Sequence, residues 1–382
     1  MRSEEDVDIS IKKVVSKKDL MEFIKLPWKI YRQMPNWVPP LISEMKHRFD
    51  ENKNPYYDHA EVELYIALMG GDIVGRIACH IDKLHNEFHK EKVAFFGFFE
   101  TLNDSRIAAK LYETAEKWGR DRDMNVLRGP MSFGTNDECA FLLEGFDSDP
   151  AVMMTYSPKY YLELTEGEGF VKAKDLLAFY KSTEDPMDPR MEKHAKRIAE
   201  DPTIHVRKFE KKNFKREMEY IKEVYDAAWE PNWGFVPMTE RELEETSKVL
   251  LEYADTDLVW FAEKTHEDGK IEPIGISIVL PNLNEATKSL NGKLGPIEIL
   301  KFLAAKKKIK GTRAILFGLK RHAQGFGIPA LLLMKTEDEA RRKGYKWCEM
   351  SWNLEDNVKI NTIDKGIGGR IYKKYRIYEK KI

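Results

Sequence analysis

The sequence predicts an α/β (α+β) protein made of two tandem domains, each with a mixed central sheet flanked by helices. Three observations predict this fold class. Strand-like apolar runs alternate with helix-like runs along the chain. Several motifs of the first half recur in the second half in the same order. A strand, a glycine-rich loop and an apolar helix follow one another between Arg313 and Lys343.

Length and composition bound the class of protein. The chain has 382 residues, which suggests two or three domains at roughly 150 residues each. Hydrophobic residues make up 42% and charged residues 33%, as in a folded globular protein. Lys and Arg number 63 against 64 Asp and Glu, so the net charge is -1. We therefore expect no nucleic-acid partner.

The cysteines and the N-terminal residues bear on compartment and metals. Cys79, Cys139 and Cys348 are far apart, without a CxxC motif or histidines at ligand spacing. We expect reduced core cysteines and no metal. The N-terminus is acidic and lacks an apolar signal region, and no apolar run reaches about eighteen residues. These features favour a cytoplasmic protein.

The duplication rests on three pairs of matches at a nearly constant spacing. The spacing is 196 residues for the first pair and 200 for the other two. The pairs are Asn36-Trp37 with Asn232-Trp233, Gly75 with Gly275, and Gly169 with Gly369. A proline-rich charged stretch separates the copies. We predict domains at residues 1–181 and 205–382, joined by a linker at 182–204.

The second copy contains a βαβ pattern around its glycine loop. Residues 313–319 read as a strand, 329–343 as a helix ended by Gly344, and 346–352 as a parallel second strand. Glycines let the backbone approach a ligand, and N–H groups at a helix start favour a phosphate or pyrophosphate. The loop has neither Gly-x-Gly-x-x-Gly nor Gly-Lys-Ser/Thr, which excludes the dinucleotide and P-loop motifs.

Gln324-Gly325-Phe326-Gly327-Ile328 after a strand resembles the acyl-CoA loop of the GNAT superfamily, whose pattern is Gln/Arg-x-x-Gly-x-Gly/Ala. The tandem arrangement is similar to that of bacterial GNAT-like proteins, which include long-chain N-acyltransferases such as bacterial ceramide synthases. The resemblance implies an enzyme that transfers an acetyl or longer acyl group from CoA directly to an amine, without a metal. One alternative uses long-chain acyl-CoA or acyl carrier protein and a lipid amine. Another is a non-catalytic ligand-binding module.

The resemblance also implies where the cofactor binds. The pyrophosphate would lie over the loop amides, and the pantetheine arm would pair with the strand that ends at Leu319. A backbone N–H near that strand end would hold the thioester carbonyl. The implied cofactor-binding residues are Phe317, Gly318, Leu319, Gln324, Gly325, Phe326, Gly327, Ile328 and Asn357.

Candidate catalytic residues come from three segments. Asp364 stands where the family often has a tyrosine general acid, so Tyr372 is our substitute for that role. Glu355 is a candidate general base, with Asp137 and Glu138 of a glycine-punctuated stretch as further candidates. The simpler interpretation of Asp137 and Glu138 is a turn that caps a helix. Pro329 removes one loop amide, and with Asp364 it motivates the non-catalytic alternative.

The first copy lacks the glycine loop, because Asn103, Asp104 and Arg106 stand at the corresponding positions. Asp104 suits a helix N-cap, but its charge would repel a phosphate. We therefore expect a degenerate domain that serves as scaffold and on the substrate side. The second copy has an insertion with an apolar helix at 296–305 and lysines from Lys306. Its simplest interpretation is a solvated helix end; the alternative is contact with a membrane or a long acyl chain, expected if the acceptor is a lipid.

Overall fold

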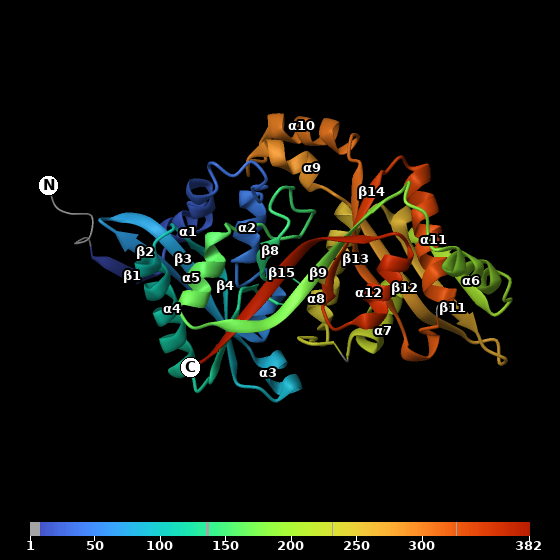
Figure 1. Cartoon of the computed structure of the whole chain (residues 1–382), viewed down its shortest axis with the longest axis horizontal. Coiled ribbons are helices and arrows are strands. Elements are labelled where there is room, and N and C mark those ends of the chain that lie inside the picture. The colour runs from blue at the N-terminus through green and yellow to red at the C-terminus, as the bar shows by residue number, and fades with distance from the viewer. Residues whose placement is uncertain (1–7, 135–136, 231, 326) are drawn as a thin grey trace. The chain divides into compact units, whose positions relative to one another are not determined.

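The computed structural model describes residues 8–134, 137–230, 232–325 and 327–382 (Figure 1). The chain forms two compact units. Unit 1 contains Met1–Leu176, Thr287–Ile299 and Lys373–Ile382, and unit 2 contains Leu177–Ala286 and Leu300–Tyr372. The limits predicted for the duplicated copies, at 181 and 205, stay a prediction.

Unit 1 begins with a strand and two helices, and most of its sheet follows. Its elements are β1 (Ile9–Lys13), α1 (Lys17–Ile30), α2 (Ile42–Arg48), η2 (Pro55–Asp58), β2 (Ala60–Met69), β3 (Asp72–Asp82), α3 (Lys83–His89), β4 (Val93–Thr101), α4 (Ser105–Arg120), β5 (Val126–Gly129), β6 (Met131–Ser132), β7 (Glu138–Cys139), β8 (Phe141–Glu144), α5 (Tyr160–Gly167) and the start of β9 (Val171–Ser182).

The strands of unit 1 form a mixed sheet in the order β1-β2-β3-β4-β5-β15, with β8 also paired to β15. β4 and β5 are parallel and are connected by α4, whereas β1 to β4 pair antiparallel. Asp104 accepts a hydrogen bond from the Arg106 N–H at the start of α4, which confirms the predicted N-cap. Tyr112 of α4 packs against Phe96 and Phe99 of β4 in the aromatic core of unit 1.

Unit 2 repeats this plan with an insertion before its glycine loop. From α6 to the C-terminus the elements are α6 (Pro189–Ala199), β10 (Ile204–Lys208), η3 (Lys211–Asn213), α7 (Phe214–Trp229), α8 (Glu240–Tyr253), η4 (Thr256–Leu258), β11 (Val259–Thr265), β12 (Ile271–Pro281), α9 (Asn284–Thr287), η5 (Lys288–Leu290), α10 (Pro296–Lys306), β13 (Gly311–Leu319), η6 (Arg321–Ala323), α11 (Gly327–Arg342), β14 (Trp347–Leu354), α12 (Val358–Gly366) and β15 (Arg370–Lys381). Most of them form unit 2. By contrast, η5, the start of α10 and most of β15 belong to unit 1.

The sheet of unit 2 has the order β9-β14-β13-β12-β11-β10. β13 and β14 are parallel and α11 connects them, while β10 to β13 pair antiparallel. The predicted βαβ unit around the glycine loop is therefore confirmed, and so is the fold class of two similar mixed α/β domains. The segment predicted as a linker contains α6, which lies beside α11 and buries Met191 and Ala195 there (Figure 1).

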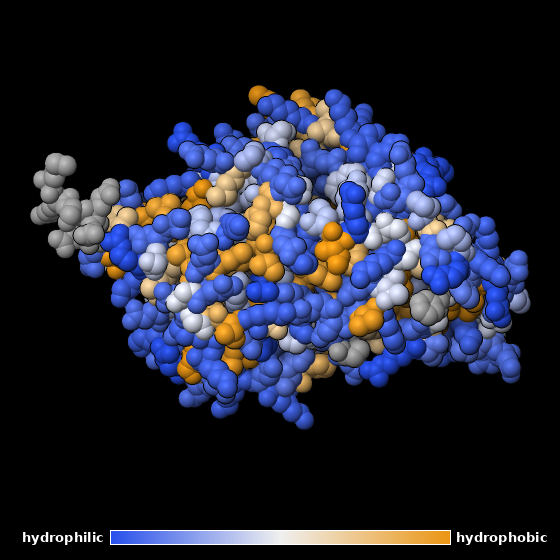
Figure 2. All heavy atoms as spheres, viewed as in Figure 1, coloured by the Kyte–Doolittle hydropathy of each residue, from blue (hydrophilic) through white to orange (hydrophobic). Residues whose placement is uncertain are grey.

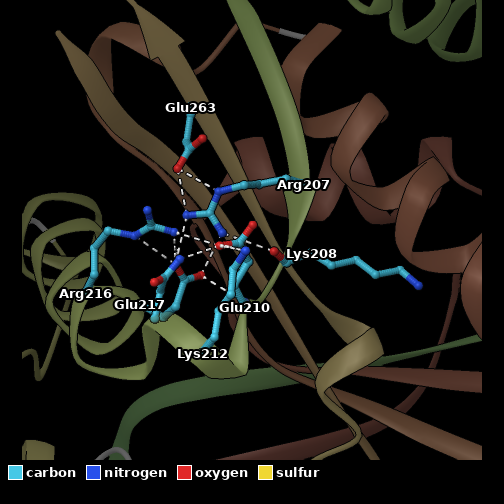
Figure 3. Close-up of polar contacts among 8 residues, drawn as sticks. Arg207, Lys208, Glu210, Lys212, Arg216, Glu217 and Glu263 are labelled. Atoms are coloured by element: carbon cyan, nitrogen blue, oxygen red, sulfur yellow. Dashed lines mark hydrogen bonds and ion pairs between the residues drawn. The ribbon is translucent and has the colours of Figure 1, made fainter.

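A buried ion-pair network attaches α7 to the sheet of unit 2 (Figure 3). The fully buried Glu217 on α7 accepts from Arg207 of β10 at 2.7 Å and from Arg216 at 2.6 Å. Arg207 also contacts Glu263 of β11 at 2.7 Å. Charge-assisted bonds of this kind fix the position of α7, which ends at Trp229 next to β13.

Candidate functional site

The two parallel strands of unit 2 separate part-way along their length. β13 pairs with β14 from Gly311 to Ala314, opposite Trp347 to Met350, and no further pair joins these strands in the part of the chain that the structure describes. A bulge on the β12 side skips Ile315 at this point. Residues 314–318 are only half-buried although β13 is a central strand. The separation leaves an unpaired edge of β13 that can pair with an extended ligand, and we call the gap between the two strands the strand opening.

In unit 1 the corresponding opening is filled by the chain itself. β4 pairs with β5 only from Val93 to Phe95, after which β6 lies beside β4. A Cβ added to Gly97 would lie 1.7 Å from the Met131 carbonyl oxygen. The Phe98 N–H donates to the Ser132 hydroxyl at 3.0 Å. The backbone of this opening is therefore already occupied, and unit 1 has no room there for an extended ligand.

The glycine loop of unit 2 follows β13 directly. The Gln324 side chain donates to the Leu319 carbonyl at 3.2 Å and accepts from Lys359 at 3.0 Å. Gly325 faces open space, whereas a Cβ at Gly327 would lie 2.2 Å from Ile198 of α6. Gly325 therefore leaves the loop backbone accessible and Gly327 permits close packing. Phe326 lies outside the described residues.

A cavity of about 360 Å³ lies at the start of α11. His194, Arg197 and Gly327 are among its lining residues, together with Ile198, Glu200 and Asp201. His194 and Arg197 are three residues apart on α6 and so share one helix face. Sequence reasoning missed both because it assigned them to a linker, although their spacing on a charged helix was a usable signal.

A buried polar cluster lies where β13 and β14 separate. Glu349 is fully buried and pairs in register with Arg313, which is 5% exposed. The Ser351 hydroxyl donates to Glu349 Oε1 at 2.7 Å and accepts from Arg313 Nε at 3.1 Å. The Tyr372 hydroxyl donates to the other oxygen of Glu349. The structure thus joins the predicted Tyr372 to Glu349, which sequence reasoning missed although its charge stands between Cys348 and Met350 in the strand.

Aromatic side chains line the other side of the strand edge. A Cβ at Gly318 would lie 2.2 Å from the ring of Trp229. Trp229 stacks on Tyr225 with centroids 5.3 Å apart, and Tyr225 contacts Phe235 at 5.5 Å. Gly318 therefore admits an apolar wall directly against β13.

Comparison with solved structures identifies the fold. The tandem GNAT protein of the clavulanic acid biosynthesis pathway matches with a TM-score of 0.55 at 11% identity, over 98% of both chains. A GCN5-related N-acetyltransferase from Sphaerobacter thermophilus matches with a TM-score of 0.53 at 12% identity, over 98% of this chain and 95% of the other. No family model matches the sequence.

Two relatives match almost the whole chain. The bacterial ceramide synthase of Caulobacter vibrioides is 35% identical over 98% of both chains. The Escherichia coli protein YghO is 34% identical, over 97% of this chain and 95% of its own length. The chain belongs to the family of these two relatives, and its fold is that of the tandem GNAT proteins. The predicted family is thereby confirmed.

Unit 2 of this chain has a second buried carboxyl group near the strand opening. Asp364 of α12 is 2% exposed, and burial raises its pKa to about 7 although a hydrogen bond from Asn353 opposes the shift. That bond is 2.6 Å long. The Asn357 side chain caps α12 by accepting from the Ile360 N–H at 3.3 Å. The cofactor contact predicted for Asn357 stays a prediction.

The remaining predicted catalytic residues lie away from the Glu349 cluster or in the other unit. Glu355 follows the last residue of β14, five positions beyond the end of the β13–β14 ladder. In unit 1, Asp137 and Glu138 contact Arg48 at 3.1 and 3.6 Å. This ion pair is a structural use for both carboxylates, and the catalytic roles stay predictions.

Three further findings concern this GNAT chain as a whole. Cys79 and Cys139 are buried, Cys348 is half-buried, and all three are free thiols. Among the described residues, no group of His, Cys, Asp or Glu side chains is arranged to hold a metal ion. In the same part of the chain, no helix has the length and apolar character needed to cross a membrane.

Proposed function

We propose that this tandem GNAT protein is an acyl-CoA-dependent N-acyltransferase whose chemistry takes place in unit 2. One observation carries the proposal. The opening between β13 and β14 leads into an accessible glycine loop in unit 2, whereas the chain's own backbone fills the opening in unit 1. An acyl-CoA needs both an extended edge for its pantetheine and amides for its pyrophosphate.

In this proposal the donor enters the strand opening in one direction. Its pyrophosphate would lie at residues 324–328, where His194 and Arg197 add positive or hydrogen-bonding groups. Its pantetheine would pair with β13 between the bulge and Leu319. The thioester then falls at the bulge, near Ile315 and Ser351. This placement moves the thioester from the predicted Phe317–Leu319 to the inner end of the opening.

The polar cluster would supply the proton transfers. The attacking amine is neutral because its ammonium form has lost one proton to solvent, its nitrogen then bonds to the thioester carbon, and the C–S bond breaks. The Tyr372 hydroxyl donates a hydrogen bond to Glu349, so as its oxygen accepts the second proton from the attacking nitrogen its own proton can pass to Glu349. The proton then returns through Tyr372 to the departing thiolate, and the products are an amide and CoA. Glu355, by contrast, lies beyond the last residue of β14, five positions past the end of the β13–β14 ladder.

A second candidate function changes the acyl chain and the acceptor. The relative named bacterial ceramide synthase supports a long-chain acyl donor and a lipid amine.

Ligand-induced thermal shifts separate the candidates. Stabilisation by acetyl-CoA and palmitoyl-CoA is expected for the general proposal, and stabilisation by palmitoyl-CoA alone for the lipid version. Gly325→Trp should abolish the shift because the side chain fills the open space above the loop. Gly167→Trp is the matched control, since it also faces open space but lies in unit 1. No shift with either donor would refute both enzyme proposals.

Turnover needs a separate measurement. Release of free CoA thiol should require both a donor and an amine, tested with short polar amines and with long-chain amino alcohols. A thermal shift without thiol release for any amine would favour the non-catalytic ligand-binding module.

A further inference from the structure

Helix α10 exposes apolar side chains on the surface of the protein. None of its eleven residues is buried. Ile297, Leu300 and Leu303 are 65%, 69% and 52% exposed, and Figure 2 shows hydrophobic residues over this helix next to hydrophilic ones. Single exposed leucines are normal on protein surfaces, but a helix made largely of them needs a partner.

The orientation of α10 is the reverse of that of an ordinary surface helix. At 100° per residue, Ile299, Leu303, Leu300 and Ile297 fall on one arc of about 160°. All four are exposed, whereas the half-buried positions are Glu298, Phe302 and Ala305 on the opposite side. Lys301 and Lys306 lie at the two borders of the apolar arc. The apolar face of this helix therefore points toward solvent.

The segments on both sides of α10 are held firmly. Before the helix, Asn291 accepts from the Trp28 indole at 2.8 Å and Gly292 accepts from the Ile42 N–H at 3.0 Å. After it, Ile309 is buried, and the N–H groups of residues 310 and 311 both donate to Glu285 at 2.8 Å. These contacts hold the chain just before and just after the helix.

Basic side chains surround the apolar arc. Residues 293–310 contain six lysines and one carboxylate, Glu298. None of the six ammonium groups has a hydrogen bond or ion pair to a residue that the structure describes. The lysines are Lys293, Lys301, Lys306, Lys307, Lys308 and Lys310.

We propose that α10 docks on an anionic lipid surface, with its apolar arc among the acyl chains and its lysines at the phosphate level. An apolar arc bordered by lysines suits a bilayer interface, because the apolar stems of the lysines can lie along the acyl chains while their ammonium groups reach the phosphates. The competing occupant of this helix face is a negatively charged protein, such as an acidic carrier protein. The inference does not rest on the proposed acyl transfer, because it uses only the surface of α10.

Flotation of the full chain with lipid vesicles tests the proposal. Vesicles with 30% phosphatidylglycerol in phosphatidylcholine should bind it at least tenfold more strongly than pure phosphatidylcholine, and high salt should weaken the binding. Leu300→Ser with Leu303→Ser should reduce binding at least tenfold. Lys307→Gln with Lys308→Gln should reduce it by about fivefold per lysine.

Matched controls use equally exposed residues elsewhere. Val15→Ser with Val171→Ser changes side chains that are 78% and 62% exposed, and Lys17→Gln with Lys18→Gln removes two exposed lysines. Both control pairs should bind vesicles like the native chain. All variants should keep the native melting temperature and the acyl-CoA thermal shift, which separates this test from that of the proposed function.

Two results would overturn the proposal. The first is native-like vesicle binding by the Leu300 and Leu303 variant. The second is loss of binding to purified acyl carrier protein in the α10 variants while vesicle binding stays unchanged, which would make the occupant a protein.

Discussion

Replacing Asp364 by asparagine should make the protein more stable at alkaline pH. Burial raises the pKa of Asp364 from 3.8 to about 7. At a pH between 3.8 and about 7, the Asp364 carboxyl is protonated in the folded state but ionised in the unfolded chain. The stability associated with this proton is complete below pH 4 and is lost as the pH rises through 7.

The size of the effect follows from the shift. At 1.36 kcal/mol per pKa unit, the change from 3.8 to about 7 costs about 4 kcal/mol once the carboxyl is ionised. About 3 kcal/mol of this cost develops between pH 5 and pH 8. Exposure of only 2% leaves little solvent to screen the charge. Asparagine is neutral at every pH and can keep the contact with Asn353.

Urea denaturation at pH 5, 6, 7 and 8 measures the effect. The free energy of unfolding of Asp364→Asn, relative to the native chain, should rise by about 3 kcal/mol over this range. Asp338→Asn, an exposed carboxyl on α11, serves as the control and should run parallel to the native chain. If Asp364→Asn also runs parallel, Asp364 is not held protonated and the burial argument is refuted.

Three further predictions test other parts of the structure. Glu217→Ala leaves two arginines without their buried partner, so urea denaturation should show a loss of about 3–5 kcal/mol. Glu349→Gln and Tyr372→Phe should each lower kcat about 100-fold with little change in KM for the donor, and the double variant should be no worse than either single one. Independent, additive losses would contradict the proton path. Gly97→Ala forces a Cβ against the Met131 carbonyl, so it should lower the stability of unit 1 by about 1–3 kcal/mol or more, whereas Gly325→Ala should leave the melting temperature unchanged.

Local features of the chain were readable without coordinates. The strand, loop and helix between Arg313 and Lys343 follow from residue periodicity, glycine positions and the helix stop at Gly344. The duplication follows from matched motifs, and the loop pattern named the family that the relatives confirm. These signals lie within short stretches of sequence, so they can be recognised without knowledge of the fold.

Part of the candidate site could not be read in this way. Glu349, Arg313 and Tyr372 come from three strands, and only the register of β13 with β14 and the course of β15 bring them together. His194 and Arg197 reach the glycine loop because α6 packs on α11, a contact between segments more than 120 residues apart.

The sequence by itself therefore determined the kinds of element, their order, the duplicated plan and the position of the glycine loop, because each depends on spacing within a few turns or strands. Only the tertiary structure decided which strand opening is free and which is filled, since Ser132 reaches Phe98 across a packed unit. It also decided that the apolar arc of α10 faces outward. Periodicity defines the two faces of a helix, but the surrounding packing selects the face that is buried.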